Sequence, residues 1–235
     1  MIDIHCHLLF GVDDGSSSLE ESQRMLDAAW GQGVRKIILT PHYRHGMFPF
    51  EKETILAHFE ILKSYAEEKD MELFLGCEYH VDSRCVENLR NGRCLTLAGS
   101  CYVLTEYSHI TEYPYIREMT GELLRNGFRP VIAHAERCSC MAEDIGRAAD
   151  LRRMGALIQI NADSVLGRSS RQEKQYCRRL LKEGGADIIA SDSHNLSDRP
   201  CRMAECRKFV EKKYGAAAAG DLFRKNPEKI LEDGV

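Results

Sequence analysis

Met1-Ile-Asp-Ile-His-Cys-His7 begins the chain as a short apolar run that leads into two histidines two residues apart. The run Ile2–Ile4 has the composition of a buried β-strand, and alternate side chains of an extended chain point to the same side. His5 and His7 would therefore present both imidazoles on one face beyond this strand, while Cys6 packs on the other. A single His-x-His pair is weak evidence for a metal site, so its meaning depends on the residues at the ends of the other strands.

Six further β-rich runs alternate with amphipathic helical segments along the rest of the chain. The first helix is well marked, because Ser18 and Glu21 have the spacing of a capping box and Gly33 provides a stop. This alternation is typical of parallel strands joined by helical crossovers, so we predict an α/β fold. The seven expected strands are Ile2–Ile4, Val34–Thr40, Glu72–Gly76, Tyr102–Thr105, Pro130–Ala133, Leu157–Ile160 and Ile188–Ala190.

Residues able to bind metal follow six of these seven strands. A closed barrel assembles its site from the carboxyl ends of many strands, whereas an open sheet concentrates its site near one switch point, so this distribution favours a barrel. The sixth strand ends at Asn161 and contributes no obvious ligand. The candidates, in chain order, are His5, His7, His42, Glu78, Glu106, His134, Asp192 and His194.

Two adjacent acids, Asp13 and Asp14, stand beside Gly15 just before the first expected helix. A turn followed by a capped helix start would explain them without any ligand. Their position at the same barrel mouth makes a carboxylate ligand the competing interpretation, and only one of the pair can readily face inward.

So many ligands imply a cluster of two or three ions, and mixed imidazole and carboxylate donors suit manganese, iron or zinc. Such a cluster provides hydroxide near neutrality and stabilises charge during phosphoryl displacement, so we expect hydrolysis of a phosphate ester. Arg137 and Arg199, each just beyond a ligand, could bind the phosphoryl oxygens through their fixed fork of N–H groups. The weaker candidates are His45, His58, His80 and His109, of which His80 is the strongest.

The composition narrows the class of protein further. The 235 residues contain no linker-like stretch, which predicts one domain over residues 1–235. A net charge of −4, with Lys and Arg spread along the chain, supplies no basic stripe for nucleic acid. The chain shows neither a signal-like start nor a bilayer-length apolar segment, so we expect a cytoplasmic protein without membrane insertion, whose ten cysteines are reduced thiols.

These residues, in their context, resemble the PHP (polymerase and histidinol phosphatase) superfamily, and more closely its bacterial manganese-dependent protein tyrosine phosphatases of the capsule and exopolysaccharide type. The resemblance spans nearly the whole chain and implies a distorted seven-stranded (β/α)7 barrel holding three ions, with Mn²⁺ expected and Fe or Zn as alternatives. Its signature pieces are Met1–His7, Asp13-Asp-Gly15, Gln32-Gly-Val34, Thr40-Pro-His42, Gly76-Cys-Glu78, His134-Ala-Glu-Arg137 and Ser191-Asp-Ser-His-Asn-Leu-Ser-Asp-Arg-Pro200.

The resemblance also implies a role for each candidate. The family pattern favours the second acid of the loop, Asp14, and assigns Arg137 and Arg199 to phosphate binding and transition-state stabilisation. Departures from the pattern, at Cys6 and at Tyr107-Ser108, affect only neighbours of ligands. The implied ligand sets are His5, His7, Glu78 and Asp192 for one ion, Glu78, Glu106 and His134 for a second, and Asp14, His42 and His194 for a third.

The implied reaction is hydrolysis of phosphotyrosine on the tyrosine-rich tail of a bacterial tyrosine kinase that controls capsular or exopolysaccharide synthesis. A PHP phosphatase acting on histidinol phosphate or another small phosphomonoester is the alternative enzyme, because it would use the same ligands. A non-catalytic metal-binding interaction module is the alternative of another class, although the intact ligand set argues against it. Cys201 and Arg207 have the spacing of a cysteine phosphatase, but the residues between them lack glycine and predict a helix.

Overall fold

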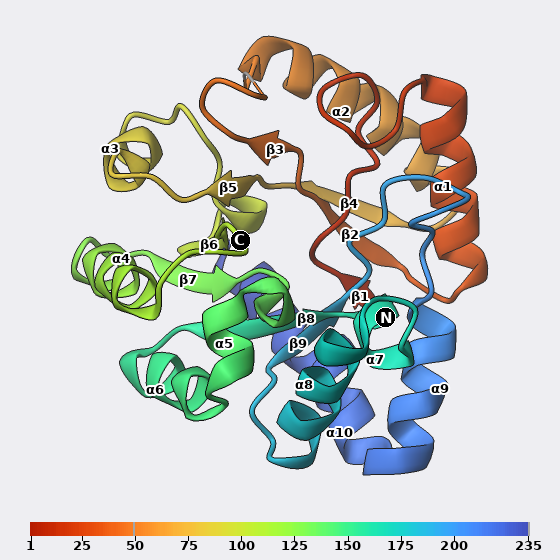
Figure 1. Cartoon of the computed structure of the whole chain (residues 1–235). Coiled ribbons are helices and arrows are strands. Elements are labelled where there is room, and N and C mark those ends of the chain that lie inside the picture. Colours follow the sequence, from red (N-terminus) through yellow and green to blue (C-terminus); the bar gives the residue numbers. More distant parts are fainter. Residues whose placement is uncertain (49, 235) are drawn as a thin grey trace.

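The computed structural model describes residues 1–48 and 50–234 and has an α/β fold. The strands surround the middle of the molecule and the helices lie outside them (Figure 1). The strands are β1 (Ile2–Asp3), β2 (Lys36–Leu39), β3 (His42–Tyr43), β4 (Glu72–Leu75), β5 (Glu78–His80), β6 (Tyr102–Glu106), β7 (Arg129–Ile132), β8 (Leu157–Asn161) and β9 (Ile188–Ala190).

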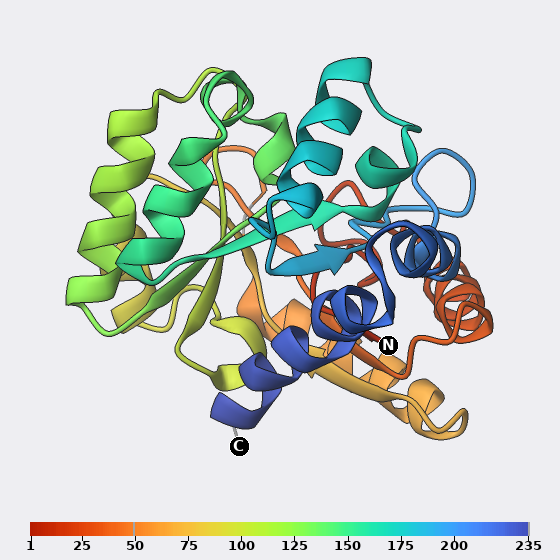
Figure 2. The same cartoon turned by 90° about the horizontal axis from the view of Figure 1, so that it is seen from below.

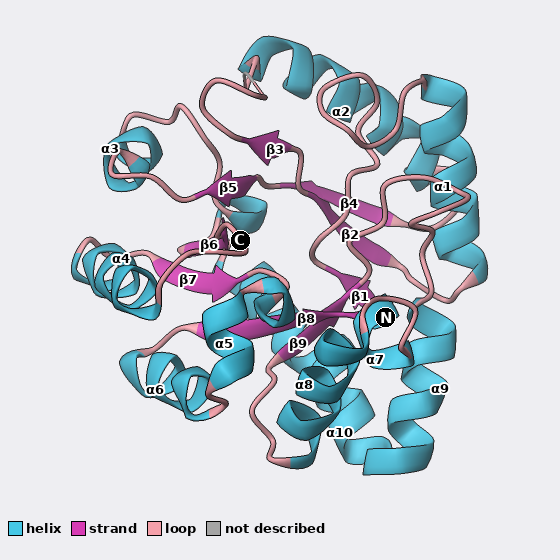
Figure 3. Ribbon diagram, viewed as in Figure 1, coloured by secondary structure: helices cyan, strands magenta, loops and turns pink. Residues whose placement is uncertain are grey.

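The helices cover the outside of the strands (Figure 3). The first begins as expected, because the Ser18 hydroxyl accepts a hydrogen bond from the Glu21 backbone N–H. Within the described residues, no helix is both long enough and apolar enough to cross a membrane. The helices are α1 (Leu19–Gly31), α2 (Lys52–Glu67), α3 (Cys85–Arg90), α4 (Tyr113–Arg125), α5 (Ser139–Glu143), α6 (Gly146–Met154), α7 (Ala162–Leu166), α8 (Arg171–Lys182), α9 (Met203–Tyr214), α10 (Ala216–Gly220) and α11 (Asn226–Asp233), with 3-10 turns η1 (Leu97–Gly99) and η2 (Ala135–Arg137) and the π-helical η3 (Asp221–Lys225).

Among the described residues, the strands pair in parallel in two sheets, ordered β1-β2-β4 and β3-β5-β6-β7-β8-β9. The parallel α/β arrangement expected from the sequence is confirmed, but two of the expected strands are shorter and each is followed by a further strand that was not expected. Val34–Thr40 is shortened to β2 and followed by the separate β3, and Glu72–Gly76 is shortened to β4 and followed by β5. Pro41 lies between β2 and β3 and has no N–H to donate to the ladder.

The two sheets are nevertheless joined by one continuous set of backbone hydrogen bonds. Gly76 N donates to Leu39 O at 2.8 Å, and Glu78 N donates to Pro41 O at 3.1 Å. At the other side of the molecule, Asp192 N donates to His5 O at 2.8 Å, so the segments that follow β1 and β9 lie side by side. The sheet therefore curls around, and the carboxyl ends of its strands meet at one face.

Two apolar clusters hold this arrangement together. The larger lies between the sheet and the surrounding helices. The smaller is formed by strand residues such as Ile2, Ile38 and Leu104 together with Ile230 and Leu231 of α11. Figure 2 shows the C-terminal helices, in dark blue, passing beside the N-terminus, so the last segment of the chain packs against the end opposite the candidate site.

Candidate metal centre

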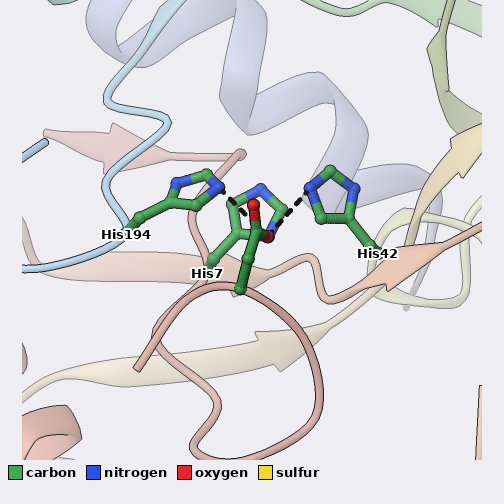
Figure 4. A group of neighbouring side chains, drawn as sticks. His7, His42 and His194 are labelled. Atoms are coloured by element: carbon green, nitrogen blue, oxygen red, sulfur yellow. Dashed lines mark ion pairs between the residues drawn. The ribbon is translucent and has the colours of Figure 1, made fainter. Parts of the chain in front are cut away.

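The loop before α1 and the segments after β1, β2 and β9 bring one group of candidate ligands together. The imidazoles of His7, His42 and His194 face one another in Figure 4. Asp14 Oδ1 lies 3.3 Å from His42 Nε2 and 3.6 Å from His194 Nε2. Ligand atoms of these four residues all lie within 4.8 Å of one another, which is close enough to hold one ion.

Glu78, the first residue of β5, lies at the centre of the site and is completely buried. Its Oε2 is 3.1 Å from His5 Nε2, 3.2 Å from His7 Nε2 and 3.1 Å from His42 Nδ1. Its Oε1 is 2.8 Å from His134 Nε2. A single carboxylate thus contacts imidazoles that follow β1, β2 and β7.

The remaining two acids complete the cluster from opposite sides. Glu106, at the end of β6, places Oε1 3.7 Å from His134 Nε2. Asp192, just beyond β9, places Oδ1 3.4 Å from His5 Nε2 and 3.6 Å from His7 Nε2. Asp192 has a positive φ of 52°, a conformation uncommon outside glycine, which turns the chain immediately after the strand.

The structure brings together all nine residues that the sequence singled out as ligands. The sets Glu78, Glu106, His134 and Asp14, His42, His194 each form a compact group, the latter with His7 added. The set expected around His5 is divided between two overlapping groups, one formed with His7 and Glu78 and the other with His134 and Asp192.

The hydrogen bonding of the cluster fits bound cations. Several buried ligand atoms have no hydrogen-bond partner within the described residues, although imidazoles and carboxylates face one another there. A buried polar atom without a partner is costly, and coordination of a cation would remove that cost. The atoms are His42 Nδ1, Glu78 Oε2, Glu106 Oε2, Asp192 Oδ1 and His194 Nε2.

The electrostatics favour cations as well. Burial opposes ionisation of Glu78, but His5 and His42 outweigh it and hold the pKa of this carboxyl well below its usual range. Burial acts in the same way on Asp192, whose pKa is kept well below its usual range by Arg137 and His5. Burial, with repulsion from Glu78, raises the pKa of Glu106 to about 7. The cluster therefore contains buried negative charge that a divalent ion would neutralise.

Residues that the sequence did not single out orient the ligands. Gln159 Oε1 lies 3.0 Å from His5 Nδ1 and accepts from the His134 backbone N–H at 2.9 Å. Gln159 Nε2 donates to Asn161 Oδ1, and Asn161 Nδ2 donates to Asp192 Oδ2 at 2.7 Å. The sixth expected strand thus contributes no ligand, but its alternate residues 159 and 161 hold three of them in place. Two amide side chains at alternate positions near the end of the expected strand were the sequence pattern that could have identified these orienting residues.

Asp13, the acid that was not chosen as a ligand, also orients a ligand. Its Oδ2 lies 2.8 Å from His7 Nδ1 and accepts from the His42 backbone N–H at 2.9 Å. The adjacent Asp14 turns the other way, toward His42 and His194. Two neighbouring carboxylates therefore have separate positions, one behind an imidazole and one within the cluster.

A pocket of about 180 Å³ lies against the cluster and contains both predicted arginines. The Nη2 atoms of Arg137 and Arg199 each lie 2.8 Å from Asp192 Oδ2. Both arginines were predicted to bind phosphoryl oxygens, and both line the pocket while also pairing with the proposed ligand Asp192. Arg44 and Phe48, which the sequence did not indicate, also line the pocket.

The weaker histidine candidates lie outside every metal-holding group found in the described residues. His80 contacts the Ser108 hydroxyl, His58 contacts the Phe10 carbonyl, His109 contacts the Arg137 carbonyl, and His45 is exposed. His80, the strongest of them by sequence, is therefore not brought into the cluster.

The cysteine alternative has no structural support. Burial raises the pKa of Cys201 to about 12, which disfavours the reactive thiolate. Most of the stretch from Cys201 to Arg207 belongs to α9, as the missing glycine predicted, so it forms no phosphate-cradling loop.

Comparison with known proteins identifies a family to which this chain is similar. The family model described as "Capsular polysaccharide synthesis, CpsB/CapC" matches residues 1–232. Tyrosine-protein phosphatase CpsB of Streptococcus pneumoniae is 38% identical over 240 residues, covering 99% of each chain. Tyrosine-protein phosphatase YwqE of Bacillus subtilis is 31% identical, covering 99% of this chain and 92% of YwqE.

Solved structures agree with this assignment. The fold matches a chain from the structures of B. subtilis YwqE and S. pneumoniae CpsB, described as unique metal-dependent tyrosine phosphatases, with a TM-score of 0.92, 30% identity, and coverage of 100% of this chain and 96% of that one. A phosphotriesterase homology protein from Escherichia coli, at 12% identity and a TM-score of 0.66, shares the fold alone, covering 98% of each chain. By its sequence over residues 1–232 and by its fold, the chain belongs to the CpsB/CapC family.

Proposed function

We propose that the chain is a metal-dependent tyrosine-protein phosphatase that acts in the cytoplasm. The observation that carries the proposal is the convergence of nine imidazole and carboxylate side chains in one cluster, beside a pocket that two arginines line. The relatives named tyrosine-protein phosphatase support it, because they match this chain along nearly its whole length.

In this proposal the nine side chains hold three ions, Mn²⁺ first and Fe or Zn as alternatives, since mixed nitrogen and oxygen donors suit these metals. Bound divalent ions would lower the pKa of a coordinated water and offset charge in the displacement. Glu78 would be shared between two ions, because its two oxygens face His5 and His134, which belong to different sets. The sets are His5, His7, Glu78 and Asp192; Glu78, Glu106 and His134; and Asp14, His42 and His194.

The protein's own groups would bind and orient the substrate. Arg137 and Arg199 line the pocket, and their remaining N–H groups can donate to phosphoryl oxygens. Phe48 stacks on His42 with ring centroids 5.1 Å apart and an angle of 9° between the planes, so it gives the pocket an aromatic wall. Met47 extends this wall and is 57% exposed. Such a wall suits the ring of a phosphotyrosyl side chain.

The substrate in this proposal is a phosphotyrosyl protein, probed first as the tyrosine-rich tail of a bacterial tyrosine kinase that controls capsular or exopolysaccharide synthesis. A phosphotyrosyl group carries its phosphate farther from the backbone than phosphoserine does. It can therefore reach Glu78, which lines the pocket and is fully buried.

The small volume of the pocket, about 180 Å³, also suits a small phosphomonoester such as histidinol phosphate. Parallel assays of the Mn²⁺-loaded protein on a phosphotyrosyl peptide, the matching phosphoseryl peptide and histidinol phosphate separate the two functions. We expect kcat/KM for the phosphotyrosyl peptide to exceed the other two by roughly tenfold or more. Equal or faster turnover of histidinol phosphate would replace the proposal with the small-molecule function, and an inactive protein with full metal content would support the interaction module.

A further inference from the structure

A second and larger cavity lies at the opposite end of the strands from the metal centre. Ile2 and Lys36, the first residues of β1 and β2, form one side of it, and η3 forms another. Its volume is about 650 Å³, compared with about 180 Å³ for the pocket at the cluster. This volume lies within the range of known small-molecule sites.

The cavity combines an apolar floor with a basic rim. Ile2, Ala219 and Phe223 are buried apolar residues that line it. Five cationic side chains and one acidic side chain, Glu228, also line it, although the whole chain has a net charge of −4. The cations are Arg35, Lys36, Arg207, Arg224 and Lys225.

The arginines of the rim are only partly neutralised. Lys36 pairs with Glu72, and Lys225 pairs with Asp221. Arg207 and Arg35 form no ion pair with a carboxylate of the described residues, and Arg35 donates instead to the Trp30 and Val34 carbonyls. Arg224 lies 3.8 Å from Glu228, near the limit for an ion pair. Burial and repulsion from Arg207, Arg35 and Arg224 lower the pKa of the amino group of Met1, a residue that also lines the cavity.

We infer that this cavity is a binding site for an organic phosphate of nucleotide size, distinct from the catalytic pocket. Arginine forks match phosphate oxygens, and the apolar floor offers a surface for the body that carries the phosphate. The wall is η3, a single π-helical turn, and such turns occur often at functional sites.

The site can be tested by titrating the Mn²⁺-loaded protein with UDP-glucose, which has no terminal phosphate monoester for the catalytic pocket to hydrolyse. Uridine serves as the probe without phosphate. Trp30 is the single tryptophan of the chain, and the Arg35 guanidinium carbon lies 4.8 Å from the centre of its ring. Tryptophan fluorescence therefore reports a ligand that engages Arg35, and calorimetry gives the affinity.

We expect saturable binding of UDP-glucose but not of uridine. Arg207→Ala should weaken binding roughly tenfold or more, whereas Lys208→Ala, the adjacent exposed cation of α9, should leave it unchanged. Arg199→Ala should also leave it unchanged, because Arg199 lies in the other pocket. Absence of saturable binding, equal losses in Arg207→Ala and Lys208→Ala, or loss in Arg199→Ala alone would each overturn the inference. The phosphatase assay of Arg207→Ala tests separately whether the proposed enzyme is intact.

Discussion

Arg199 contacts Asp192 at 2.8 Å, while 34% of its side chain stays exposed in the pocket. If the exposed N–H groups stabilise charge on the phosphoryl oxygens, Arg199→Ala should lower kcat by roughly 10²-fold or more. Metal content should stay normal, because Asp192 keeps hydrogen bonds to Arg137 and Asn161. Steady-state kinetics and metal analysis on the same samples measure both effects.

Two further variants serve as controls for this experiment. Arg199→Lys should recover little activity, since a point charge cannot reproduce a two-pronged contact. Asp192→Ala removes a proposed ligand and should lower metal content and activity together. Wild-type turnover in Arg199→Ala, or metal loss equal to that of Asp192→Ala, would assign Arg199 a different role.

Gln159 is fully buried and hydrogen-bonds two proposed ligands, His5 and His134. It reaches a third, Asp192, through Asn161. Gln159→Met keeps the size of the side chain but removes the acceptor shared by His5 and His134. We expect metal affinity to fall roughly 10- to 100-fold, the usual cost of losing a group that orients a ligand. Activity should recover in part at high Mn²⁺. Binding titrations of the stripped protein measure this change.

The matched control is Gln172→Met, which makes the same change on the exposed surface of α8. It should leave metal affinity unchanged. Unaltered affinity in Gln159→Met would show that the ligands are held without this amide.

At the scale of elements, the loop between β1 and α1 packs directly on the backbone of a ligand. A Cβ added to Gly15 would lie 2.1 Å from His7 O, far inside contact distance. Gly15→Ala should therefore displace the loop that carries Asp13 and Asp14, lowering the melting temperature and the metal content. Thermal unfolding and metal analysis measure these effects. Gly31→Ala has open space for its Cβ and should change neither, and an unaffected Gly15→Ala protein would contradict the packing.

Helix α9 leads to a prediction about Cys201. Its thiol has a raised pKa, and the residues that follow it are helical rather than looped around a phosphate. Cys201→Ser should leave kcat within roughly twofold of the wild-type value, because no thiolate attack contributes. Loss of several orders of magnitude in the same phosphotyrosyl assay would restore the cysteine mechanism.

The elements that the sequence predicts best are those whose signal is local. The Ser18 cap of α1 and the apolar strand runs are readable because caps and burial depend on near neighbours in the chain. The end of the expected strand Val34–Thr40 at Leu39 and the separate strand β3 were not predicted, although Pro41 lies between β2 and β3. An apolar run in the sequence does not show at which residue the backbone hydrogen bonds between paired strands end.

At the scale of the whole molecule, the distribution of polar residues after successive strands predicted that they would meet, and they do. What the sequence could not show is which residues support them. Gln159 is 154 positions from His5, so its contact exists only once the sheet has curled. The basic cavity was also missed, because its cations come from distant parts of the chain and the sequence has no basic stripe.

The central claim, that the clustered ligands hold the ions on which hydrolysis depends, is tested by stripping the protein of metal with a chelator, removing the chelator and adding back Mn²⁺. Phosphotyrosyl hydrolysis and bound metal are measured at each stage. We predict that stripping abolishes turnover, and that Mn²⁺ restores it in proportion to the metal bound. Zn²⁺ and Fe²⁺ added in parallel would rank the alternative metals. Full turnover by protein shown to be free of metal would contradict the account.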